Sequence, residues 1–188
     1  MNVVGTNIMS ENVSRYSANT YKRKNITQKN SFSKGISLKM NDSETGRKAL
    51  TSVGFPDGST VSVFEANDSS KMLTKYDVKY WSKTGEEDNY IIEPIKVNPE
   101  YASYIDMLAY STFLDKSGKT KNAFGDFISA SRGIDGNIQY NSNNIDNKNN
   151  FLLLVQEFMN QQYKVGNMAG YLSSKSFFDC MRMDDIGK

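Results

Sequence analysis

The amino-acid sequence predicts an α+β protein, in which a small antiparallel sheet is followed by about three α-helices. Three observations predict this class. Strand-like patterns and turn signals fill residues 51–97, helical spacing of apolar residues follows from residue 98 onward, and residues 1–48 show no core-facing pattern. Strands first and helices second is typical of helices that cover one face of an antiparallel sheet. The 188 residues have room for one ordinary domain and an extension.

Residues 1–48 are predicted to be a flexible basic tail, ahead of a single globular domain at 49–188. Asn, Ser, Thr and Lys dominate the tail, and its scattered apolar residues cannot offset the entropic cost of ordering the backbone. Residues 1–50 hold nine basic and three acidic residues, a net charge of +6, and the rest holds 14 basic and 18 acidic residues, a net charge of −4. Within the tail, the alternating stretches 32–36 and 36–40 have the pattern of a strand that adds to the body or to a partner.

The first half of the body has the pattern of strands and turns. Gly54–Gly58 is a turn signal, and strands are predicted at Thr60–Phe64, Asp77–Trp81 and Asn89–Ile92. The charged residues between the last two strands predict a hairpin. Pro94 places the final strand at an edge of the sheet or ends it there.

The second half of the body has the pattern of helices. Asn98–Glu100 predicts a helix start, with Asn as the N-cap, Pro in the first position and an acid in the first turn. Gly118 is expected to close this first helix, and Phe124–Ile128 predicts a short helical turn. The expected apolar stripe of the first helix is Ala102, Ile105, Leu108, Ala109, Thr112 and Phe113.

Two further helices are predicted after an Asn-rich loop at Asn137–Asn150, in which Asp146 or Asn147 caps the first of them. Gly166 ends or bends that helix, and Asn167 caps the last one. The expected apolar positions are Phe151, Leu154, Val155, Phe158, Met159 and Gln162 in the third helix, and Met168, Tyr171, Leu172 and Phe178 in the last.

Three core residues follow from these patterns. Tyr80 and Trp81 should lie on opposite faces of one strand, and we expect Trp81, the one tryptophan of the chain, to be the residue in the core. Leu154 and Phe158 should lie in the core one helical turn apart.

The composition excludes several kinds of chemistry. The chain contains no histidine, which removes the commonest general base, Ser–His and Cys–His nucleophile pairs and His-ligated zinc. Cys180 is the one cysteine, so no internal disulfide forms; beside Asp179, with Arg182 as the basic residue near it in sequence, it is interpreted as a buried or inert thiol. No run of apolar residues approaches the length of a membrane span.

Short motifs in the sequence have simpler structural explanations. Ser117–Thr120 is similar to the end of a phosphate-binding loop, but Phe113 stands where that motif needs a glycine, and a helix precedes it instead of a strand. A helix end explains the segment better. Ser31–Lys34 and Lys83–Gly85 match two boxes of penicillin-recognising serine enzymes, but the first lies in the tail and the chain is short for that fold.

Charged clusters also have simple explanations. The acids Glu86–Asp88 at the predicted hairpin tip are interpreted as a solvated turn, since catalytic carboxylates usually converge in a cleft. Asp135–Asn137 and Asn141–Asn150 offer oxygen ligands without the spacing of a calcium loop. Lys22–Lys24 has the charge to touch phosphates or an anionic membrane, although a solvated tail explains it as well. We therefore assign no catalytic, cofactor-binding or metal-binding residue.

Two segments resemble parts of other proteins: Asn98–Tyr110, NPEYASYIDMLAY, and Gln162–Leu172, QYKVGNMAGYL. They are similar to segments of small uncharacterised proteins from Gram-positive, clostridium- or bacillus-like bacteria. The resemblance covers less than half of the chain and brings no functional residues. It implies a bacterial origin and one domain with a strand-rich half followed by a helical half.

Three functions compete on this evidence. The first is a non-catalytic protein-interaction module that engages another protein through the tail or the C-terminal helices, where the small Ala169 and Gly170 permit close helix approach. The second is a binder of nucleic acid or an anionic surface through the basic tail, against which the acidic body argues. The third is an enzyme that uses a carboxylate or lysine. The N-terminal residues lack the basic head and apolar stretch of a secretory signal, which predicts a cytoplasmic location.

Overall fold

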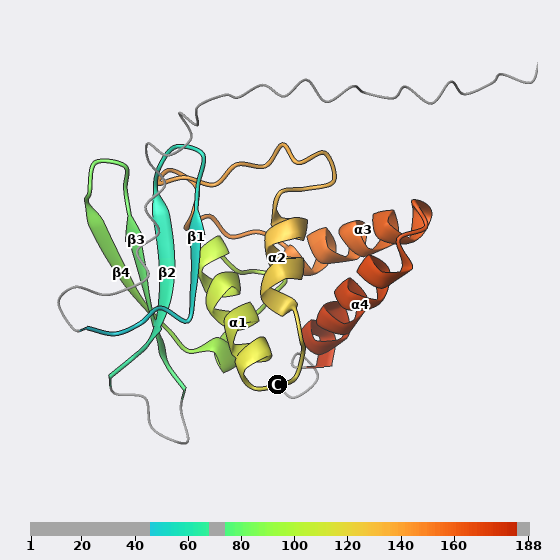
Figure 1. The fold of residues 1–188 in the computed structure, drawn as a ribbon, viewed down its shortest axis with the longest axis horizontal. Coiled ribbons are helices and arrows are strands. Elements are labelled where there is room, and N and C mark those ends of the chain that lie inside the picture. The colour runs from blue at the N-terminus through green and yellow to red at the C-terminus, as the bar shows by residue number, and fades with distance from the viewer. Residues whose placement is uncertain (1–45, 68–73, 184–188) are drawn as a thin grey trace, which may run out of the picture. The chain divides into compact units, whose positions relative to one another are not determined.

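The computed structural model describes residues 46–67 and 74–183 and confirms the predicted α+β class (Figure 1). The predicted tail up to residue 45, with its strand-like stretches and its basic cluster Lys22–Lys24, lies outside the described residues. In the described part, the elements are β1 (Thr51–Gly54), β2 (Thr60–Glu65), β3 (Tyr76–Trp81), β4 (Glu87–Ile92), the 3₁₀-helix η2 (Pro94–Lys96), α1 (Tyr104–Lys116), α2 (Ala123–Ser131), α3 (Phe151–Lys164) and α4 (Met168–Met183).

The strands form an antiparallel sheet in the order β1-β2-β3-β4, so each strand pairs with its neighbour in the chain. The predicted turn between β1 and β2 closes with a hydrogen bond from the Phe55 N–H to the Ser59 carbonyl and another from the Gly58 N–H to the Phe55 carbonyl. The predicted hairpin between β3 and β4 turns at Ser82–Glu86. Gly85 has a φ of 92°, in the left-handed region that favours glycine. Helix α1 packs against β2 and β3, and in Figure 1 the helices lie on one side of the sheet.

The two faces of the sheet bury different residues. Val61 pairs with Tyr80 and Val63 pairs with Val78, and all four side chains are buried in the main core between the sheet and the helices. Trp81 lies on the opposite face. The choice of Trp81 as the core anchor is therefore wrong: Tyr80 is 2% exposed in the main core, and Trp81 is 9% exposed in a small separate cluster.

The outer face is held by a polar network around the aromatic pair Phe64 and Trp81, whose rings meet edge to face at 6.5 Å. The Trp81 indole N–H donates to Glu87 at 2.7 Å, and the Lys79 ammonium lies 3.0 Å from the other carboxylate oxygen of Glu87. Arg47 pairs with Asp77 at 2.6 Å and lies over the Phe64 ring. The sequence places Trp81 on the outer face because successive side chains of a strand alternate, and the indole N–H then needs an acceptor.

The first helix begins later than predicted. Ser103, and not Asn98, is the N-cap of α1: its hydroxyl accepts from the Asp106 N–H, and the Asp106 carboxylate accepts from the Ser103 N–H. The Asn98 side chain instead accepts from the Glu100 N–H within a turn. The Pro99 carbonyl accepts from the backbone of Phe151, so this segment is held against the start of α3 and does not extend α1. The helix ends as predicted, with Gly118 at a φ of 73°.

The third helix is capped by Asn150, whose side chain accepts from the Leu153 N–H; Asp146 and Asn147 do not cap it. Its fully buried residues are Phe151 and Val155. The prediction that Leu154 and Phe158 are core residues is wrong, because both are only partly buried against the core. Helix α3 packs mainly against α4 and α2, so its buried face is narrower than the apolar stripe of the sequence.

The last helix starts at the predicted cap, since the Asn167 side chain accepts from the Gly170 N–H. Its buried residues are Ser174, Phe177 and Met181. Met168 and Leu172, expected on the apolar stripe, are instead exposed.

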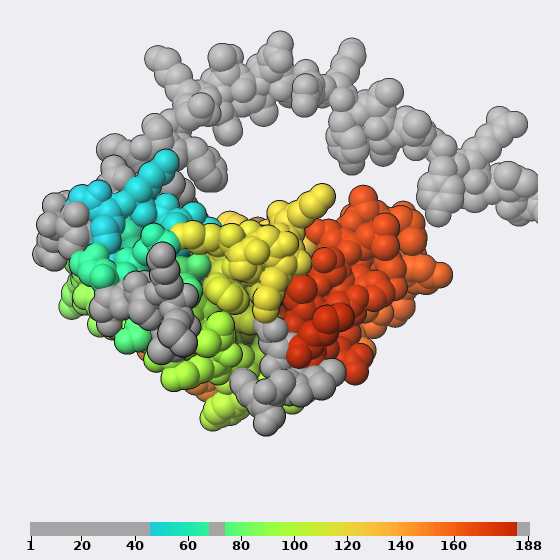
Figure 2. Space-filling view, turned by 90° about the horizontal axis from the view of Figure 1, so that it is seen from below, coloured from blue at the N-terminus to red at the C-terminus, as the bar shows by residue number. Residues whose placement is uncertain are grey.

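Helix α2, longer than the predicted turn, joins the rest of the helical half through a buried carboxylate. Asp126 accepts hydrogen bonds from the hydroxyls of Ser173 at 2.7 Å and Ser174 at 3.2 Å, both on α4. Burial raises the pKa of Asp126, although the hydrogen bonds from the two serines oppose the rise. Figure 2 shows α2 (yellow) between the sheet at one side and the α3–α4 pair (orange to red) at the other.

The stability of the protein should respond to pH through Asp126. Because the pKa of Asp126 is higher in the folded state than in the unfolded state, folding favours the protonated carboxyl. The stability that this protonation contributes is fully present below about pH 4, where the unfolded chain is protonated too. It is lost as the pH rises through the pKa of the folded state. Urea midpoints of the wild type and of Asp126→Asn should therefore differ in a pH-dependent way, with the wild type gaining relative to the variant on acidification. A difference that stays constant with pH would contradict this account.

The aromatic contacts of the core predict a second difference. Phe127 is fully buried and meets Tyr104 at 4.9 Å and Phe151 at 5.6 Å between ring centroids. Phe127→Ala should cost about 3–5 kcal/mol of unfolding free energy in chemical denaturation. Leu154→Ala should cost less than half as much, since that side chain is only partly buried. Equal costs would show that Leu154 belongs to the core after all.

Candidate functional site

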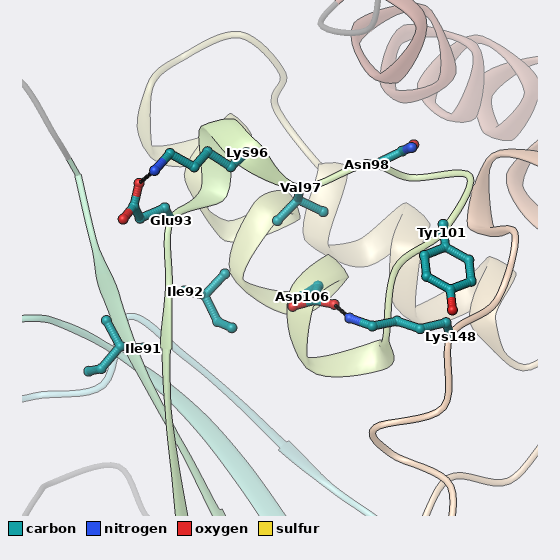
Figure 3. Close-up of a pocket in the computed structure, with 9 residues that line it drawn as sticks. All are labelled: Ile91, Ile92, Glu93, Lys96, Val97, Asn98, Tyr101, Asp106 and Lys148. Carbon is teal, nitrogen blue, oxygen red and sulfur yellow. Dashed lines mark hydrogen bonds and ion pairs between the residues drawn. The ribbon is translucent and has the colours of Figure 1, made fainter.

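A groove of about 380 Å³ lies where the end of β4 meets η2 and the start of α1 (Figure 3). It is lined by Ile91, Ile92, Glu93, Lys96, Val97, Asn98, Tyr101, Asp106 and Lys148. These residues come from four parts of the chain: the edge strand, the 3₁₀-helix, the turn before α1 with its first helical turn, and the Asn-rich loop. Figure 3 shows Ile92 directed towards α1 and Ile91 directed to the other side of the strand.

The sequence builds this groove by ending β4 with Pro94. Proline cannot donate to a strand ladder, and here it begins η2, which turns the chain away from the sheet. The following residues pass the N-terminus of α1, where the Ser103 capping box fixes the position of Asp106. Lys148 reaches Asp106 from the Asn-rich loop, and the Ala102–Asn149 bridge holds that loop in place.

The charged side chains of the groove neutralise one another. Glu93 pairs with Lys96 at 2.5 Å, and Asp106 pairs with Lys148 at 2.5 Å. The same Asp106 oxygen, Oδ2, that meets Lys148 also accepts from the hydroxyl and the N–H of Ser103, so this oxygen belongs to the helix cap. Among the lining residues, each carboxylate therefore has an ammonium partner, and none stands in the contrasting environments that acid–base catalysis by two carboxylates needs.

Exposed apolar side chains surround the groove. Ile91 is 61% exposed, Ile95 47% and Tyr101 70%. Strand β4 is an edge of the sheet, so in the described part of the chain β3 pairs with one of its sides and no strand pairs with the other. Open edges with apolar side chains are sites at which further strands add, and proteins usually protect them with charge or cover. The apolar residues beside this open edge therefore make it the candidate binding surface of the groove.

A second hollow, beside Tyr140, is lined by the amides of the Asn-rich loop. These amides already serve the fold. Asn144 bonds to the backbone of Asn141 and Gln139, and Asn150 caps α3. The loop connects α2 to α3 as predicted, but Asn150 caps α3 in place of the predicted Asp146 or Asn147.

Each of the other candidates from the sequence has an ordinary structural role. The segment Ser117–Thr120 ends α1, and the Thr120 hydroxyl donates to Asp115 at 2.6 Å. Glu87 lies in β4 and not at the hairpin tip; partial burial disfavours its charge, but the hydrogen bonds from Lys79 and Trp81 outweigh this and lower the pKa of its carboxyl. Cys180 is partly buried, with its thiol 3.7 Å from the Lys119 carbonyl.

Metal sites and membrane spans are both missing from the described residues. Within residues 46–67 and 74–183, no group of three His, Cys, Asp or Glu side chains lies close enough together to hold a metal ion. Within the same ranges, no helix combines the length and the apolar character needed to cross a membrane.

No protein-family model, curated protein or solved structure matches this chain. The resemblance of Asn98–Tyr110 and Gln162–Leu172 to Gram-positive bacterial proteins stays a prediction. The groove was not predicted from the sequence, because its residues come from segments up to 57 positions apart, from Ile91 to Lys148. The one available signal was Pro94, which predicted an edge strand or a strand end at this position.

Proposed function

We propose that the protein is a non-catalytic interaction module that binds an extended segment of another protein along the open edge of β4. The observation that carries the proposal is the exposure of Ile91, Ile95 and Tyr101 beside an edge strand. In strand addition, the backbone of the edge supplies hydrogen bonds, and pockets for alternate side chains supply specificity.

The chemistry of the edge favours a particular kind of segment. The first half of β4 is polar and acidic, with Asp88 exposed, and the second half is apolar. A segment with one basic residue and alternating apolar residues complements both halves. An apolar side chain of that segment enters the groove over Ile92 and Val97, whose charged walls are already neutral. Binding then depends on apolar contact and backbone hydrogen bonds and only weakly on salt.

A random peptide library displayed on phage and selected on the full chain tests this function. Selected peptides should be apolar at alternate positions, and Ile91→Glu should weaken their binding at least about tenfold, since it places a charge against the outer face of the added strand. Leu153→Glu is the matched control, because Leu153 is also a half-exposed apolar residue but lies on α3. Equal binding by both variants would contradict the proposal.

The backbone component has its own test. Methylation of alternate backbone nitrogens in a selected peptide removes the hydrogen bonds that strand addition requires and leaves the side chains unchanged. Methylation of the nitrogens that face β4 should abolish binding, and methylation of the nitrogens that face away from β4 should be tolerated. Tolerance of both registers would show that the peptide does not add as a strand.

A further inference from the structure

Helix α4 carries a second apolar feature, on the side opposite its buried face. Ser174, Phe177 and Met181 face the core. The residues on the reverse side recur at spacings of three or four: Met168, Leu172, Lys175, Asp179 and Met183. We name these five residues the α4 stripe. Figure 2 shows α4 (red) at the surface of the described residues.

The stripe is more apolar than a solvent-facing side requires. Met168 is 49% exposed, Leu172 60% and Met183 68%. A surface helix usually places charged and polar residues opposite its core-facing stripe. Three large apolar side chains in one row on that side indicate a surface that is covered by another molecule.

The charges of the stripe identify that molecule. Lys175 and Asp179 lie between the apolar residues, are partly exposed, and form an ion pair with each other at 2.5 Å. In an antiparallel pair of α4 helices centred at the level of Phe177, Lys175 of one copy lies opposite Asp179 of the second copy. The two-fold symmetry repeats the same contact in the other direction. One basic and one acidic residue at equal distances from the centre make the stripe self-complementary.

The apolar residues fit the same arrangement. In this antiparallel alignment Leu172 lies level with Arg182 and Met183 of the second copy, so Leu172 and Met183 cover each other on both sides of the charged centre. Gly170 does not contribute to this contact. Its bare Cα faces Gln162 and Asn167 within the turn between α3 and α4, where a Cβ would come within 3 Å of both side chains.

We infer that the protein forms a symmetric homodimer through the α4 stripe. One helix face is smaller than the roughly 800 Å² per partner of a standard interface. Dimer formation is therefore concentration-dependent. The surface is separate from the groove at β4, so each copy in the dimer keeps its groove open and the dimer offers two of them.

Exchange of charges tests the dimer in the full chain by sedimentation velocity over a concentration series. The wild type should dimerise. Lys175→Glu alone and Asp179→Lys alone should each stay monomeric, because like charges then face each other across the two-fold axis. An equimolar mixture of the two variants should form a heterodimer, since the two acidic side chains of the first variant then face the two basic side chains of the second.

Controls separate the dimer from folding and from other surfaces. Far-ultraviolet circular dichroism should show that both charge variants stay folded, since a like-charge pair within one exposed helix face destabilises the helix only slightly. Leu172→Glu should abolish the dimer, and Leu153→Glu on α3 should leave it intact. A wild type that is monomeric at every concentration, or a mixture that stays monomeric, would overturn the inference. Peptide binding at β4 is measured separately and is unaffected by either result.

Discussion

Helix α1 lies between the inner face of the sheet and the other helices, and the rest of the fold depends on its burial. Most of its thirteen residues are buried, including polar ones such as Ser111 and Thr112. Their hydroxyls bond to the Leu108 carbonyl one turn earlier, which satisfies them without water. On one side α1 packs on β2 and β3, and on the other it packs on α2. Because the sheet and α2 both pack against this one helix, α1 joins the strand half of the described residues to the helical half.

This central position explains how the groove at β4 is built. The capping box at the start of α1 fixes Ser103 and Asp106, and Asp106 in turn holds Lys148 of the Asn-rich loop. Two walls of the groove, the first turn of α1 and the Asn-rich loop, are therefore tied to the most buried helix. Strand β4 is the edge of the sheet opposite β1. Its side chains alternate between the core face and the outer face, and Ile91, on the outer face, is exposed. A rigid wall beside an open edge suits the binding of an extended segment without a large ordering cost.

The sequence predicted the fold class, the strands β2, β3 and β4, the ends of α1 and α3 and the start of α4, because alternating apolar residues and the turn-forming Pro and Gly act locally. It failed where two local signals competed or where neighbours decided burial. Asn98–Glu100 and Ser103–Asp106 both have the residues of a helix start, and contact with α3 selects the second. Trp81 is the larger side chain, but strand register gives the core position to Tyr80. The groove could not be predicted, since it joins segments that are distant in sequence. The exposed stripe of α4 resembled a core-facing stripe because both are apolar at helical spacing.

Native-state hydrogen exchange tests the central role of α1 most directly. If α1 joins the two halves, its amides and those of β2 and β3 exchange only by global unfolding, and share the slowest rate in the protein. The α3–α4 pair, whose helices pack mainly on each other and on α2, should exchange faster through partial opening. Exchange of α1 that is faster than that of α3 and α4, or a sheet that exchanges independently of α1, would contradict the account.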